Sequence, residues 1–318
     1  MKKAVYLLAI IGFIVVTPLF FCSVKITKPY DEIALGKQLF FDSILSSNYK
    51  LSCASCHKPE FAFADNIAIS LGVDGKKGVR NTPSAMNVTN ASFFFWDGRA
   101  ATLEEQALMP ISNPVEMNLP IDSALHRLRH SKFYSEVFNE IFNEDPSAKN
   151  LGKALAAFQK SMETSDSPFD DWKVNENENA IGKSAKRGFE LFNGKANCVR
   201  CHFGSDFSNN EFRNIGLYNE KYLNDSGRGA ITKLKTDLGK FKIGPLRNVA
   251  LTAPFMHNGM FKTLREVIDY YNEPDKIIPN AINRDLLLST PLRLSEQEKC
   301  DLENFLRSLT SKSLVAKH

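Results

Sequence analysis

Several features that mark major classes of proteins are missing from this 318-residue sequence. Its 40 Lys and Arg residues are scattered among 36 Asp and Glu residues and form no long run of one sign. The small net charge of +4 argues against a nucleic-acid partner. Segments that alternate apolar and polar residues are scarce, so few strands are expected. No long apolar run follows residue 21.

The one long apolar run lies at the N-terminus. Lys2 and Lys3 precede apolar residues from Ala4 to Phe21, a pattern typical of an export signal. Eighteen residues can also just cross a bilayer, so residues 1–22 are either a cleaved signal peptide or a membrane anchor. Cys22 adds lipidation as a third alternative, although the bulky Phe21 fits poorly before a lipoprotein cleavage site. We therefore expect an exported, periplasmic protein, and membrane attachment stays open.

The six cysteines do not suggest a disulfide framework. Four of them belong to two Cys-x-x-Cys-His units, and Cys22 and Cys300 stand apart from these. In such a unit two thioethers attach a haem, and the histidine that follows ligates the iron. Zinc sites and redox dithiols also use Cys-x-x-Cys pairs, but a histidine after both pairs and the export signal favour haem. The sequence thus predicts two covalently bound haem c groups, with attachment residues Cys53, Cys56, Cys198 and Cys201 and proximal ligands His57 and His202.

A degenerate repeat divides the chain. The phrases Gly36–Phe40 and Gly188–Phe192 share the pattern Gly-x-x-Leu-Phe, and each precedes a haem unit. The polar segment Asp170–Ala180 between them lacks apolar periodicity and is expected to be a linker. We predict a mainly α fold with two cytochrome c-like haem domains in tandem, at residues 23–178 and 179–318.

Helix signals dominate within both predicted domains. Apolar periodicity predicts helices at residues 121–142 and 151–162. Ser295 and Glu298 form a capping box before an apolar stripe, so another helix is expected there. The segments around Asn81 and Leu251 are expected to be ordered loops.

Beyond the haem units, the sequence resembles the bacterial di-haem cytochrome c peroxidase family, including its MauG branch. The resemblance covers nearly everything after residue 22, and its further landmarks follow the family order: Arg80–Ser84, Phe95–Ala100, Leu103–Gln106, Asn113–Met117 and Leu246–Pro254. It implies a peroxidatic haem in the first domain and an electron-transfer haem in the second.

The resemblance also implies roles for single residues. Glu116 is expected to be the acid/base carboxylate over the first haem, assisted by Gln106, because splitting peroxide requires moving a proton between its oxygens. Trp96 is expected to relay electrons between the haems. A calcium ion is expected to be held through oxygen atoms of three residues: Asn81, Thr252 and Pro254. Taken alone, Glu116 would be a surface residue of a loop and Trp96 a core residue. The three calcium residues would be ordinary loop and turn residues.

Two positions depart from the common pattern of that family. Many members carry a histidine that blocks the first haem until the second is reduced, whereas this chain has Val73 at the matching place. The first haem is therefore expected to be open without reductive activation. Tyr271 stands where typical peroxidases place a methionine ligand, and the MauG branch has a tyrosine at this place. Tyr271 is therefore the preferred distal ligand of the second haem. Tyr270, Met256 and Met260 are alternatives.

The expected function is reduction of hydrogen peroxide to water, with electrons from a small reduced c-type cytochrome or copper protein. One alternative is a MauG-like oxidase that modifies residues of a partner protein through high-valent haem iron. Another is a pure electron carrier, which the absent histidine at position 73 and the presence of Glu116 and Gln106 argue against.

His126 and His130 lie four residues apart and are expected on a solvated helix face. His257 is expected near the second haem or its propionates, and Cys300 has no assigned role. Dimerisation stays open.

Overall fold

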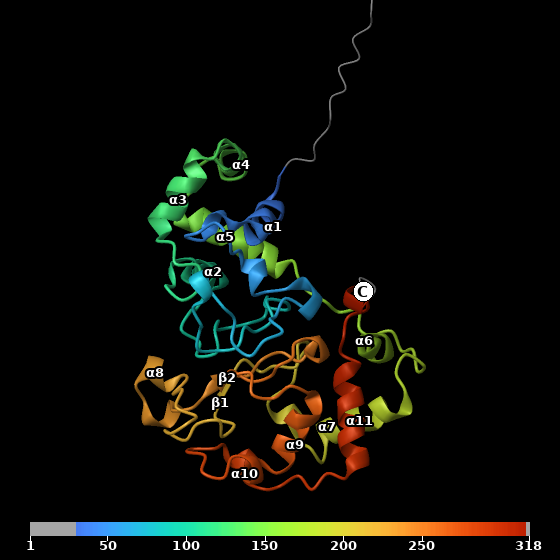
Figure 1. Cartoon of the computed structure of the whole chain (residues 1–318). Helices are drawn as coiled ribbons and strands as arrows, with labels where there is room; N and C mark the ends of the chain where they lie inside the picture. Colours follow the sequence, from blue (N-terminus) through green and yellow to red (C-terminus); the bar gives the residue numbers. More distant parts are fainter. Residues whose placement is uncertain (1–29, 316–318) are drawn as a thin grey trace, which may run out of the picture.

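The computed structural model describes residues 30–315, which form two lobes built mainly from helices (Figure 1). The predicted signal or anchor at residues 1–22 lies outside the described residues. Among residues 30–315, no helix is both long and apolar enough to cross a bilayer. The prediction of a mainly α fold is confirmed.

The first lobe is built around the pair α1 and α5. Leu35, Leu39 and Phe40 of α1 are almost fully buried against Leu155 and Phe158 of α5. Its helices are α1 (Glu32–Phe41), α2 (Leu103–Ser112), α3 (Ile121–His130), α4 (Lys132–Phe142) and α5 (Ala148–Lys160). The predicted helix at residues 121–142 is thus two helices, because the Ser131 side chain caps α4 at the point where α3 ends.

The second lobe repeats this plan with α7 and α11. Phe192 of α7 is buried against Leu302 and Phe305 of α11, and α9 packs beside them. Its elements are α7 (Lys183–Asn193), β1 (Phe212–Arg213), α8 (Gly229–Thr232), β2 (Phe241–Lys242), α9 (Leu264–Asn272), α10 (Pro274–Ile277) and α11 (Glu296–Arg307), and α6 (Pro168–Lys173) precedes them in the segment between the lobes. The two strands pair antiparallel, and the capping box of Ser295 and Glu298 begins α11 as predicted.

The segment between the lobes is more ordered than its composition suggests. Asp170 lies in α6, and Phe169 packs against the second core, so part of the predicted linker is helical. Beyond α11, α12 (Lys312–Val315) brings Leu314 back to the first core. The boundary at residues 178 and 179 stays a prediction.

The same close helix contact occurs in both lobes. A Cβ atom on Gly36 would lie 1.8 Å from the backbone oxygen of Ala154, and one on Gly188 would lie 2.0 Å from that of Asp301. Phe158 and Phe305 lie beside the two glycines in equivalent places. Glycine is required because any side chain would push the helices apart. The sequence repeat therefore corresponds to a structural repeat.

A second repeated unit is a turn that precedes α2 and α9. Phe94 bridges Ala100 in the first copy, and Phe255 bridges Phe261 in the second. Residues Phe95 and Met256 both have left-handed φ angles, +63° and +71°. Trp96 and His257 consequently hold equivalent places in the two turns.

Ion pairs and hydrogen bonds join the lobes beside these turns. Arg80 bonds to Asp97 at 2.5 Å and to Asp225 of the second lobe at 2.7 and 2.8 Å. Arg228 also donates to the backbone oxygen of Gly98 at 2.8 Å. The turn that carries Trp96 is thereby held against the second lobe.

Candidate functional site

One continuous cavity of about 690 Å³ reaches both Cys-x-x-Cys-His units. Its lining comes from both lobes and includes nearly all of the residues selected from the sequence. These are Cys53, Cys56, His57, Asn81, Trp96, Gln106, Glu116, Cys198, Cys201, His202, Thr252, Pro254 and Tyr271. The structure therefore brings residues separated by more than 200 positions in the chain to a single site.

The two units have the same local geometry. A turn of 3₁₀ helix begins at Cys53 in one unit and at Cys198 in the other. The Nδ1 atom of His57 donates a hydrogen bond to the backbone oxygen of Phe63, and that of His202 donates to Phe207, both at 2.9 Å. Because Nδ1 carries the proton, Nε2 of each ring is free to ligate a metal.

The cysteines fit haem attachment better than the alternative chemistries. All five cysteines among residues 30–315 are free thiols. Burial raises the pKa of Cys53 and of Cys198 to about 12, whereas redox dithiols depend on a lowered thiol pKa. In the described part of the chain, no three His, Cys, Asp or Glu side chains gather in a way that could hold a metal ion.

Glu116 lies in a loop after α2 and faces the cavity with Gln106. The Asn113 side chain donates to Oε1 of Glu116 at 2.7 Å. Burial raises the carboxyl pKa, an effect that Arg99 and the Asn113 hydrogen bond partly oppose. A carboxyl group with a raised pKa is suited both to accept and to return a proton.

The segment that carries Val73 supports the Glu116 loop. The backbone N–H of Val73 donates to the backbone oxygen of Glu116 at 2.8 Å, and the Val73 side chain is fully buried. A Cβ atom on Gly72 would lie 2.1 Å from the backbone oxygen of Val115. The contacts that Asn113, Val73 and Gly72 make with the Glu116 loop were not predicted from the sequence. Asn113 lies within the family phrase Asn113–Met117, so its contact with Glu116 could have been expected.

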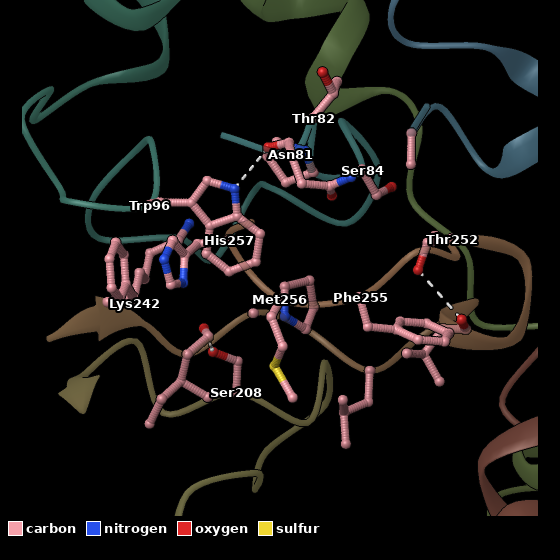
Figure 2. A pocket seen from close by; sticks show the side chains of 18 of the residues that line it. Asn81, Thr82, Ser84, Trp96, Ser208, Lys242, Thr252, Phe255, Met256 and His257 are labelled. Atoms are coloured by element: carbon pink, nitrogen blue, oxygen red, sulfur yellow. Dashed lines mark hydrogen bonds between the residues drawn. The ribbon is translucent and has the colours of Figure 1, made fainter. Parts of the chain in front are cut away.

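Trp96 lies where the two lobes meet, as Figure 2 shows. Its Nε1 donates to the backbone oxygen of Asn81 at 2.8 Å, and its ring meets the ring of His257 edge-on at 6.5 Å. His257 is 4% exposed and stacks on Phe241 at 3.6 Å. Burial lowers the pKa of His257 to about 4, so its ring is neutral at pH 7. Sequence reasoning did not pair these two rings.

The three residues selected for calcium line the same cavity. The Asn81 amide nitrogen donates to the backbone oxygens of Ile67 and Ala68 at 3.3 and 3.2 Å, which directs its amide oxygen to other partners. The hydroxyl of Thr252 donates to the backbone oxygen of Val249 at 3.2 Å (Figure 2). Oxygen donors suit calcium, and the site itself stays a prediction.

The candidates for the second distal ligand separate into two groups. Tyr271 and Met256 line the cavity. Tyr270 is fully buried, and its hydroxyl donates to the backbone oxygen of Ile215, so it is committed elsewhere. Burial raises the pKa of Tyr271, and Tyr270 and the two nearby thiols of the second haem unit add to the rise. Tyr271 therefore lies close to the second unit.

Two remaining groups of interest lie on the surface. His126 and His130 are exposed on α3 and stack with their ring centres 3.9 Å apart. No third ligand joins them within residues 30–315, which agrees with a solvated helix face. Cys300 is exposed on α11 and has no feature that assigns it a role.

Comparison with known proteins agrees with this geometry. Residues 30–179 match the family model for di-haem cytochrome c peroxidase. The chain is 37% identical to the methylamine utilization protein MauG of Methylorubrum extorquens, over 88% of this chain and 78% of that protein. It is 36% identical to cytochrome c551 peroxidase of Pseudomonas aeruginosa, over 74% of this chain and 69% of that protein. A crystal structure of a MauG-like protein associated with microbial copper homeostasis superimposes with a TM-score of 0.81 at 33% identity, covering 89% of this chain and 90% of that one.

Proposed function

This chain belongs to the di-haem cytochrome c peroxidase family, which includes MauG, and we propose that it reduces hydrogen peroxide to water at the haem held by Cys53, Cys56 and His57. The observation that carries the proposal is the shared cavity. It joins the first haem unit to a carboxyl group with a raised pKa, and it continues to the second haem unit. A pure electron carrier would need no such carboxyl group beside the first haem unit.

Each haem, when bound, supplies an iron that can exchange electrons, and the protein supplies proton transfer and position. Glu116 takes a proton from the inner oxygen of peroxide and delivers it to the outer one, which then leaves as water. Asn113 holds Oε1 of Glu116 during this transfer. Gln106 orients peroxide from the same wall, because its amide both donates and accepts hydrogen bonds.

Trp96 connects the two halves of the reaction. It is fixed through Asn81 and packs against His257 of the second lobe, so it offers an aromatic route between the two haem units. A small reduced c-type cytochrome or copper protein would deliver electrons to the second haem. We also propose export to the periplasm and a calcium ion held by Asn81, Thr252 and Pro254.

A MauG-like oxidase of a partner protein is the second candidate. It is favoured by Tyr271, which lines the cavity near the second haem unit while Tyr270 is bonded elsewhere. It is also favoured by the buried Val73 at the position of the blocking histidine. Turnover with a reduced small cytochrome supports the peroxidase, whereas long-lived oxidation of both haems by peroxide without such turnover supports the oxidase.

The first experiment is low-temperature electron paramagnetic resonance of the ferric protein, before and after one equivalent of peroxide. We expect one high-spin signal that peroxide removes. In the Tyr271→Phe variant we expect the low-spin signal to change, whereas Tyr270→Phe, the matched control, should leave it unaltered. Two low-spin signals that ignore peroxide would exclude both proposed activities.

A further inference from the structure

The cavity contains one sheltered cation without a carboxylate partner. Six Lys and Arg side chains line the cavity, and four of them form ion pairs with acidic side chains of the protein: Arg80, Arg99, Arg213 and Arg247. Arg200 is exposed to solvent. Lys242, at the end of β2, is only partly exposed, and its ammonium group forms no ion pair within residues 30–315.

The contacts of Lys242 fix it at the junction of the lobes. Its backbone N–H donates to the backbone oxygen of Trp96 at 2.8 Å, and its Nζ atom donates to that of Phe93 at 3.0 Å. The same nitrogen lies 5.8 Å from the centre of the Phe94 ring. Both ends of the residue thus hold the turn that carries Trp96. One backbone acceptor engages one of three ammonium protons, and two donors are left for a group in the cavity.

A sheltered cation of this kind is unfavourable unless an anion compensates it. Burial lowers the pKa of Lys242 to about 8, so the side chain is still mostly charged at pH 7. His257, which stacks on the adjacent Phe241, is neutral and supplies no compensation. An anionic group that enters the cavity would remove this cost.

We propose that Lys242 binds a propionate carboxylate of one of the two haems, an inference that rests on the proposed function. The haem is the one expected occupant of this cavity that brings carboxylates with it, and both attachment units open into the cavity. The ammonium group balances the propionate charge and favours the ferrous over the ferric state. It also ties the haem edge to the backbone beside Trp96.

The test compares redox titrations of the haem-loaded wild type with those of Lys242→Met and Lys242→Arg. We expect Lys242→Met to lower the midpoint potential of one haem by about 59 mV, which is a tenfold change in its one-electron reduction equilibrium. Lys242→Arg keeps the charge and should restore most of the potential. Lys240→Met is the matched control, because Lys240 is already paired with Asp237 at 3.0 Å.

Unchanged potentials in Lys242→Met would overturn the assignment even where peroxide still reacts normally. Wild-type protein that binds two haems but ignores peroxide would instead overturn the proposed function and leave this site standing. If Lys242→Met does not fold, infrared difference spectra of wild type and Lys242→Arg with ¹³C-labelled propionates decide the matter. A shift of the labelled carboxylate band supports the contact, and identical bands refute it.

Discussion

Replacing Gly188 by alanine should loosen the second haem unit, because α7 and α11 touch at this glycine. The new Cβ would start 2.0 Å from the backbone oxygen of Asp301 and 2.8 Å from the Cβ of Phe305. It must move about 1.4 Å to reach the ordinary contact distance of about 3.4 Å. Neither neighbour is the end of a flexible side chain, so the two helices must separate.

The expected magnitude follows from two opposing terms. Overpacking of this kind costs about 1–3 kcal/mol, and alanine in place of glycine within a helix returns about 1 kcal/mol. Because the closest neighbour is backbone, which cannot rotate away, the overpacking cost should be about 2–3 kcal/mol, so we expect a net loss of about 1–2 kcal/mol in the free energy of unfolding. For a lobe of this size, this corresponds to a fall of roughly 2–8 °C in Tm.

Calorimetry of the haem-loaded protein measures this loss and assigns it to a lobe. Gly36→Ala should destabilise the first lobe in the same way, because it makes the equivalent contact with Ala154. Lys183→Ala, at an exposed position of α7, is the control for helix propensity alone. A Gly188→Ala variant that is as stable as the wild type, or more so, would refute the close helix contact.

Three further predictions concern protons and metal. Glu116→Gln should slow the reaction with peroxide about 10²- to 10⁴-fold without lowering stability at pH 7, since burial already disfavours the charged carboxylate. Stopped-flow kinetics measures the rate and denaturant unfolding measures the stability, and a loss of rate together with a loss of stability would indicate a structural role. Arg187 lowers the pKa of Asp301 to about 2, so the ion pair stabilises the protein fully above about pH 4. This stabilisation is lost as the pH falls toward 2, and Asp301→Asn should therefore flatten the dependence of Tm on pH between these values. Removing calcium with a chelator should slow turnover, and full activity of metal-free protein would count against the predicted ligands, Asn81 among them.

The parts of the molecule that local sequence determines were predictable. The Cys-x-x-Cys-His units are local because thioether spacing and the following histidine lie within one turn of chain. The capping box at Ser295 also depends on three neighbouring residues, and α11 begins there. By contrast, the break at Ser131 was missed because the apolar periodicity continues from one helix into the next. The capping box of Ser167 and Asp170 was an available signal for α6 within the supposed linker.

The parts that depend on distant segments were not predictable from pattern. The contact between Trp96 and His257 joins residues 161 positions apart, and no periodicity encodes it. Nothing in the sequence distinguishes Lys242 from other lysines. Only the fold places its ammonium group against the Phe93–Trp96 turn, where it has no carboxylate partner. The roles of Glu116, Tyr271 and the calcium residues came from family resemblance, and their common cavity now gives that resemblance a spatial basis.

The two copies of the turn before α2 and α9 give the molecule an internal standard. They share a bridge and left-handed residues at matching places, so each copy serves as a reference for the other. A difference in behaviour between the two turns can then be attributed to their rings, an indole at position 96 and an imidazole at position 257, rather than to the course of the backbone.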